Sequence, residues 1–423
     1  MLSQTRSINR LLHHQLGIHV DYSATPIPLR LKPSRQFPFL ARHPWVHAHA
    51  LSENGDDLAC GQVVDLLDFE GNWIARGLIN PKSRLRIRLY SFDANVSIDD
   101  EFFLARIDAA IARRRLTGEI EASGAERIVF SESDLLSGLI VDRYADCLGV
   151  QFTAGALTRW QAPILSHLRS RLSARGVMVR MDEKTAKYEG LETLGQWLDG
   201  KAIEDSVIYT QNGLQCAVDL HGGQKTGGYL DQRLNHLAAA QYMNGRRVLD
   251  VCCYNGGFGL LALKQGAAAV TGIDSSAPAI EQAKQAIARN GLDADAFGKT
   301  DYRIADCFDE LKRLGEAAES FDAVILDPPR FAGNRHQVDT AMRAYRRINA
   351  MAVDLLPPGG ILVTCSCSGR VSRTEFLNML LDVGRRRRRD LVMLENRGPA
   401  PDHPIAISCP ETDYLKCVIA QVE

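Results

Sequence analysis

Apolar and polar residues follow two different patterns along the chain, and the change falls near residue 206. Before it, short runs of alternating apolar residues are broken by turn residues, as at 70–72, which separates two strand-like stretches. After it, apolar strands alternate with helical stretches such as 277–292. Strands that alternate with helices predict a parallel α/β sheet. The second pattern therefore predicts the domain in which a ligand site is expected.

The patterns divide the chain into four regions. Residues 1–28 are expected to form an extension that is disordered, with a transit peptide as the alternative. Residues 29–95 predict a small β-barrel-like module, and 96–205 predict a mixed α/β domain to which residue types assign no chemistry. Within it, apolar positions predict a helix at 99–116, and the polar segment 182–190 suits a loop. Residues 206–423 predict the parallel α/β domain.

Composition excludes several classes of protein. The 423 residues are 45% hydrophobic and 24% charged, with a formal net charge of −1, which excludes a disordered chain and a uniformly basic nucleic-acid clamp. No apolar run reaches the roughly 18 residues of a membrane-spanning helix. The N-terminus lacks a secretory signal, so the ten cysteines are expected to be reduced. Their spacing does not match a zinc site, and no metal is expected.

Positive charge is nevertheless concentrated in places. Arg84, Arg86 and Arg88 alternate with apolar residues, so a strand would place the three guanidinium groups on one face. This stripe is either a solvated face or, with Arg42 nearby, a surface that contacts RNA phosphates. The run 385–389 consists of five arginines. It either binds phosphate or forms the basic C-terminus of a helix.

A glycine-rich turn follows the first strand of the α/β domain. The strand ends at Asp250, and three glycines follow it as G-G-x-G, which allows a tight turn next to a ligand. The second strand ends at Asp274, 24 residues later, and a third acid, Asp306, follows the next strand. The dinucleotide pattern G-x-G-x-x-G is absent, which favours S-adenosylmethionine (SAM) over NAD. The alternative is that each aspartate only caps the next helix.

Two further strand ends carry candidate chemistry. Asp327 is followed by two prolines, and Phe331 comes soon after, so a flat base could be hydrogen bonded by Asp327 and stacked on Phe331. Cys367 leaves the next strand at the edge where ligands bind in open α/β sheets. A thiolate at this position could add to carbon 6 of a pyrimidine and activate carbon 5 for methylation. Cys365, one step deeper in the strand, is expected to belong to the core.

These motifs resemble one known family. The segments that carry the resemblance are HPWV (43–46), SESDLLSGLIVDRY (131–144), GGQKTGGYLDQR (222–233), VLDVCCYNGGFG (248–259), LDPPRF (326–331) and TCSCSG (364–369). The chain from about residue 29 onwards resembles the SAM-dependent 23S rRNA methyltransferases with an N-terminal PUA domain, which form 5-methylcytosine.

The resemblance implies a fold and a set of site residues. The expected fold is a Rossmann-like class I SAM methyltransferase domain at 206–423, preceded by a PUA module at 29–95 and a central α/β domain. Cys367 would be the nucleophile and Asp327 a second catalytic residue. The expected partner is large-subunit rRNA in the cytoplasm, and a homodimer is left open. The implied SAM-binding residues are Asp250, Tyr254, Gly256, Gly257, Asp274, Asp306, Cys307 and Asp327. The candidate RNA contacts remain those of the basic stripe and the stacking argument: Arg42, Arg84, Arg86, Arg88 and Phe331.

The chain departs from the family pattern in two places, and other functions stay open. Leu135 and Ser137 replace a glycine and a proline of the central block, and Arg330 follows the DPP prolines where other RNA 5-methylcytosine enzymes carry a second cysteine. The base that removes the carbon-5 proton is therefore unassigned. One alternative is a guanine-N methyltransferase of the same fold, in which Cys367 is only core. Another is a non-catalytic RNA-binding assembly factor.

Overall fold

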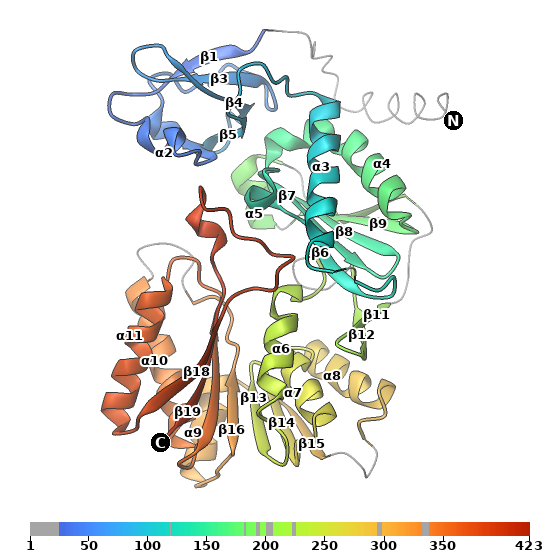
Figure 1. The fold of residues 1–423 in the computed structure, drawn as a ribbon, viewed down its shortest axis with the longest axis vertical. Helices are drawn as coiled ribbons and strands as arrows, with labels where there is room; N and C mark the ends of the chain where they lie inside the picture. Colours follow the sequence, from blue (N-terminus) through green and yellow to red (C-terminus); the bar gives the residue numbers. More distant parts are fainter. Residues whose placement is uncertain are drawn as a thin grey trace.

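Three sheet-based bodies follow one another from the N-terminus to the C-terminus of the chain (Figure 1). The computed structural model describes residues 25–118, 120–181, 183–191, 195–199, 206–221, 226–293, 298–331 and 338–423. Residues 1–24, and with them nearly all of the expected N-terminal extension, lie outside this description. Among the described residues, no helix has the length and apolar character needed to cross a membrane.

The first body is a five-stranded sheet in the order β1-β3-β4-β5-β2. The residues that follow its two edge strands pair with each other, Leu31 with Leu51, and this bridge closes the sheet into a small barrel, as expected. The turn at 70–72 joins β3 to β4, which confirms the predicted hairpin. The elements are β1 (Ile27–Arg30), α2 (Phe37–Leu40), β2 (Trp45–His47), β3 (Val63–Leu67), β4 (Trp73–Ile79) and β5 (Leu85–Ser91).

The central body has a five-stranded sheet in the order β10-β9-β8-β7-β6, against which α3 and α4 pack. Phe103, Ile107 and Ile111 of α3 are buried, so the predicted helix face is confirmed. The segment 182–190, expected as a loop, instead contains a helix, α5 (Glu183–Glu189), whose Glu189 is buried against the first body. The other elements are α3 (Asp100–Arg115), β6 (Ala125–Phe130), β7 (Leu139–Tyr144), β8 (Cys147–Phe152), α4 (Gln161–Leu172), β9 (Gly176–Arg180) and β10 (Gly195–Asp199).

A hairpin of β11 (Val207–Gln211) and β12 (Leu214–Val218) precedes the third body, a seven-stranded sheet in the order β15-β14-β13-β16-β17-β19-β18. Its first five strands are parallel, and β19 runs antiparallel to both neighbours. Helices cover both faces, as the alternation of strands and helices predicted. The strands are β13 (Arg247–Val251), β14 (Ala269–Asp274), β15 (Lys299–Ile304), β16 (Ala323–Leu326), β17 (Gly360–Ser366), β18 (Leu391–Arg397) and β19 (Lys416–Val422). The helices are α6 (Arg233–Ala240), α7 (Gly257–Lys264), α8 (Ala277–Arg289), α9 (Cys307–Glu316), α10 (Val338–Asp354) and α11 (Arg373–Arg387).

The loop 398–415, called here the C-terminal loop, joins the three bodies. It leaves the third sheet after β18 and returns through β19 (Figure 1). Asp402 accepts a hydrogen bond from the backbone N–H of Arg127 in the central body at 2.9 Å. Glu411 lies 3.2 Å from the imidazole Nε2 of His43 in the first body. The loop therefore fixes the first two bodies relative to the third.

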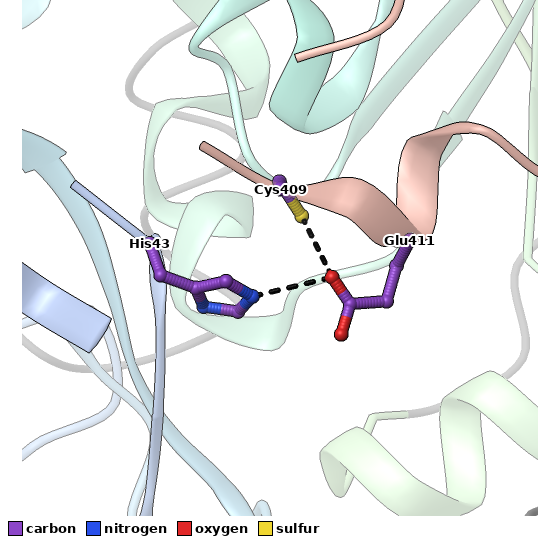
Figure 2. Close-up of side chains that lie close together, drawn as sticks. All are labelled: His43, Cys409 and Glu411. Carbon is purple, nitrogen blue, oxygen red and sulfur yellow. Dashed lines mark hydrogen bonds and ion pairs between the residues drawn. The ribbon is translucent and has the colours of Figure 1, made fainter. Parts of the chain in front are cut away.

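Figure 2 shows the contact of this loop with the first body, in which His43, Cys409 and Glu411 converge. Their ligand atoms lie within 4.8 Å of one another, a spacing that a metal ion could use. The Cys409 thiol instead donates to Glu411, and burial raises its pKa. A metal ion would need the thiolate. The cluster is therefore explained as a contact between the loop and the barrel.

Candidate active site

The candidate residues of the third body meet at one edge of its sheet. Parallel pairing aligns Val251 with Ile273 and with Leu326, and Leu326 with Thr364. All four strands end within two residues of these positions, so their ends lie side by side at the carboxyl edge of the sheet. In open α/β sheets this edge is the usual ligand site.

The turn after β13 has an unusual backbone. Cys252, Tyr254 and Gly256 all have positive φ, at 59°, 50° and 82°. Non-glycine residues rarely adopt this region, and when they do so at a strand end the strain usually serves a site. The next two glycines are required by close packing. A Cβ on Gly257 would lie 2.4 Å from the His236 ring, and one on Gly259 would lie 2.5 Å from the Tyr302 hydroxyl.

Asp250 supports this turn from beneath. Its side chain is fully buried and accepts a hydrogen bond from the backbone N–H of Gly259 at 2.9 Å. Burial raises the pKa of its carboxyl to about 7. The structure therefore shows Asp250 bonded to the backbone at the start of α7, and its contact with the cofactor stays a prediction.

Asp274 is partly exposed at the end of β14 and connects two turns. Its two carboxylate oxygens accept from the backbone N–H groups of Tyr254 at 2.9 Å and Ser276 at 2.8 Å. Ser276, not Asp274, is the residue that caps α8. Each carboxylate oxygen retains a lone pair for a further donor, such as a ribose hydroxyl. Asp274 therefore keeps the position expected of a residue that binds the sugar of a nucleoside.

Asp306 and Cys307, at the start of α9, follow the end of the neighbouring strand β15. Asp306 is exposed and caps the helix by accepting from the N–H groups of Phe308 and Asp309, so the capping interpretation applies to it. Cys307 is hydrogen bonded by the thiol of Cys252, which lowers the pKa of Cys307 and raises that of Cys252. Contact between the turn after β13 and the start of α9 is thereby established.

Asp327 and Cys367 meet at the next two strand ends. Asp327 accepts a hydrogen bond from the side-chain amide of Gln232 at 3.0 Å. The thiol of Cys367 lies 3.8 Å from the carbonyl oxygen of Pro328. Cys367 is partly exposed, whereas Cys365 is fully buried in β17 opposite Cys417. The structure therefore separates a cysteine at the edge from a cysteine in the core, as the sequence predicted.

The sequence did not predict two residues that contact the strand ends at Asp327 and Cys367, namely Gln232 and Tyr345. The hydroxyl of Tyr345 on α10 is hydrogen bonded to Ser366 and Ser368, both at 3.0 Å, so it holds the residues on either side of Cys367. Phe331, expected to stack on a base, packs against Tyr345 with ring centroids 4.8 Å apart. Its ring thereby belongs partly to the core beneath the edge. The hydrogen bonds of Tyr345 to the two serines could not be predicted, because the residues lie more than 20 positions apart and no repeated pattern in the sequence connects them.

The basic stripe on β5 is mostly internal. Arg86 and Arg88 are each 8% exposed. Arg86 pairs with Asp56 at 2.8 Å, and Arg88 pairs with Glu132 at 3.2 Å and Glu189 at 3.6 Å. The prediction that these two arginines contact RNA is therefore wrong, because both side chains are buried and paired with carboxylates of the protein itself.

Arg84 and Arg42 keep the exposure that a phosphate contact needs. The guanidinium of Arg42 lies 5.6 Å from the centre of the Phe92 ring, which orients it on the surface of the first body. Contact of these two residues with RNA stays a prediction.

Replacing Arg88 by methionine is expected to lower the free energy of unfolding by about 3–5 kcal/mol. The change leaves two buried carboxylates, Glu132 and Glu189, without their guanidinium partner. Urea unfolding measures the loss, with Arg84→Met as the exposed control, for which a change within about 0.5 kcal/mol is expected. Equal stability of the two variants would contradict a structural role for Arg88.

The arginine run 385–389 closes helix α11, which ends at Arg387. Arg385 and Arg386 pair with Asp382 at 2.8 and 2.9 Å, and Arg389 donates to the carbonyl oxygen of Glu423 at 2.7 Å. These contacts favour the helix-end interpretation over a phosphate site.

Comparison with known proteins assigns the domains. The model of the S-adenosylmethionine-dependent methyltransferase family matches residues 184–408, and the model of the PUA-like domain matches residues 29–92. A relative named ribosomal RNA large subunit methyltransferase I, from Shewanella denitrificans, is 37% identical over 397 residues, which cover 94% of this chain and 99% of the relative. A protein of the same name from Tolumonas auensis is 38% identical over 92% of this chain and 98% of its own length.

Solved structures share the complete arrangement of the three bodies. The crystal structure of SMU.776 complexed with SAH superposes with a TM-score of 0.80 at 18% identity, covering 93% of this chain and all of the other. A presumed SAM-dependent methyltransferase from Streptococcus mutans gives a TM-score of 0.78 at 17% identity with the same coverage. At these identities the likeness concerns the fold alone.

SAM is the cofactor of this family, and the edge of the sheet suits it. The Asp274 carboxylate lies at the end of β14, partly exposed and at hand for a ribose, next to the turn with positive φ after β13. When bound, SAM supplies an activated methyl group. The Rossmann-like sheet, the PUA-like barrel and the full-length relatives agree: the chain belongs to the S-adenosylmethionine-dependent methyltransferase family, in the group that contains the ribosomal RNA large subunit methyltransferases I.

Proposed function

We propose that this protein methylates carbon 5 of a cytosine in large-subunit rRNA, in the cytoplasm, with Cys367 as the nucleophile. The observation that carries the proposal is the position of the Cys367 thiol, 3.8 Å from the carbonyl oxygen of Pro328, where the ends of β16 and β17 meet. The names of the full-length relatives support rRNA as the substrate. The PUA-like module, with Arg42 and Arg84 on its surface, supports a contact with RNA.

The chemistry follows from the low reactivity of carbon 5. The thiolate of Cys367 adds to carbon 6, and the new S–C6 bond makes carbon 5 electron-rich enough to take the methyl group of SAM. A base then removes the proton from carbon 5, the S–C6 bond breaks, and the thiolate is restored. In this proposal Asp327 hydrogen bonds the edge of the base, and the hydrogen bond that it accepts from Gln232 supports that role by fixing its carboxylate.

The identity of the methylated nucleoside tests the proposal. Large-subunit rRNA from cells that lack the protein is incubated with the purified protein and SAM, digested to nucleosides and measured by mass spectrometry. We expect 5-methylcytidine at up to one residue per rRNA. Methylguanosine would instead support the guanine-N alternative. The absence of a methylated product from both rRNA and tRNA would support a non-catalytic RNA-binding role, and either result would contradict the proposal.

A further inference from the structure

Lys416 is a lysine buried beneath the loop 367–371, called here the cysteine loop. It begins β19 and is 1% exposed. Its ammonium donates to the carbonyl oxygens of Ser368 at 2.8 Å, Val371 at 2.7 Å and Tyr414 at 2.8 Å. An ammonium has three N–H donors, so every donor of Lys416 is used. Two of the three acceptors belong to the cysteine loop.

The positive charge of Lys416 is costly where it lies. Its direct acceptors are neutral carbonyl oxygens, and in the described part of the chain it forms no ion pair with a carboxylate. Burial lowers its pKa to about 8. Of the charged groups that face it, Asp413, Glu375 and a thiolate at Cys367 favour the ammonium, and Arg373 opposes it. A neutral side chain would avoid most of this cost.

The hydrogen bonds alone do not explain a lysine at this position. The cysteine loop has a second anchor on its other side, where the Tyr345 hydroxyl is bonded to Ser366 and Ser368. What Lys416 adds to this anchor is a positive charge at neutral pH, held by the carbonyl oxygen of Ser368 next to Cys367. A nearby positive charge favours the thiolate, which is the nucleophilic form of cysteine.

We propose that Lys416 is a positioning residue for Cys367: it holds the cysteine loop in place, and its charge stabilises the thiolate of the nucleophile. The inference rests on the proposed covalent function. It assigns a role at the active site to a residue of β19, the last strand in the chain. Lys416 lies outside the motifs that carry the family resemblance.

The pH dependence of alkylation at Cys367 tests the inference. The full-length protein is treated with iodoacetamide over a range of pH, and the Cys367 peptide is quantified by mass spectrometry. In Lys416→Met we expect the midpoint of alkylation to rise by about one pH unit, since loss of a neighbouring positive charge disfavours the thiolate in a partly buried site. Methyl transfer at pH 7 should fall about tenfold and recover towards pH 9.

Two further variants sharpen the test. Lys416→Arg keeps the charge with a different donor geometry, so its alkylation midpoint should stay near that of the wild type while methyl transfer slows. Lys264→Met is the matched control. Lys264 also donates to two backbone carbonyl oxygens, those of Asn212 and Gly213 at 3.0 and 2.8 Å, but it lies at the end of α7 away from Cys367. Its alkylation profile should equal that of the wild type.

The outcomes separate this inference from the proposed function. An unchanged alkylation midpoint in folded Lys416→Met would overturn the role of Lys416. If that variant does not unfold cooperatively, Lys416→Arg decides, because a midpoint raised by a full unit despite the retained charge would overturn it as well. Alkylation does not depend on methyl transfer. The proposed function fails instead if a Cys367 variant still methylates RNA, whatever the result for Lys416.

Discussion

Replacing Cys367 by alanine is expected to lower methyl transfer to rRNA by at least about 10³-fold, because the covalent route to an activated carbon 5 is lost with the thiol. Binding of SAM should stay within about twofold. The thiol contacts the loop after Asp327 rather than the glycine turn, so its removal leaves the expected cofactor side of the edge intact. Single-turnover transfer of a labelled methyl group measures the first effect, and calorimetry with SAM measures the second.

Cys365→Ala is the matched control for this variant. Cys365 lies two residues earlier on the same strand but is fully buried opposite Cys417, and burial raises its pKa well above that of an ordinary thiol. Its loss should cost stability through a small cavity and leave the transfer rate within about threefold. If Cys367→Ala retained the wild-type rate, the covalent mechanism would be refuted and the guanine-N alternative favoured.

A second measurement traps the adduct directly. In RNA that carries 5-fluorocytidine at the target, the fluorine cannot leave as a proton does, so the S–C6 bond should persist after methyl transfer. We expect a protein–RNA band that survives denaturing electrophoresis with the wild type and is missing with Cys367→Ala. A persistent band with Cys367→Ala would mean that another residue is the nucleophile.

The sequence predicted the ligand edge well because the geometry of parallel sheets is local and repetitive. Asp274, Asp327 and Cys367 each follow a short apolar strand, and parallel strands bring their carboxyl ends to one edge. The order of the strands in the sheet was not needed for that step. The separation of Cys365 from Cys367 required only the alternation of side chains along β17.

The predictions that failed concerned side chains whose burial or partners depend on segments far away in the sequence. The alternation of side chains on β5 correctly placed Arg86 and Arg88 on one face. Arg88 is paired with Glu132 and Glu189, however, and these two residues come from later parts of the chain. Lys416 was overlooked for the same reason, since two of its three acceptors lie 48 and 45 residues earlier in sequence. The bond between Asp250 and the backbone N–H of Gly259 was not predicted either, because it depends on the path of the turn after β13.

Removing the Asp274 carboxylate is expected to weaken SAM binding by about 10²-fold. Two hydrogen bonds from ribose hydroxyl groups to a carboxylate account for a loss of this order. The backbone N–H groups of Tyr254 and Ser276 also lose their acceptor in Asp274→Ala, which loosens the strained turn after β13. Calorimetry with SAM and with its demethylated product measures the affinities, and both should fall equally because the two share the ribose.

Asp301→Ala serves as the control for Asp274→Ala, since Asp301 is an exposed acid on the neighbouring strand β15, three residues before the strand end. Like Asp274→Ala, it removes one negative charge from the same region of the sheet, but it touches neither the turn nor the edge. Its SAM affinity should therefore match that of the wild type. Equal losses in the two variants would show that long-range charge, and not contact with the ribose, explains the effect. An Asp274→Ala affinity within threefold of the wild type would place the ribose elsewhere on the edge, and Asp306, which already caps α9, would then have to bind it.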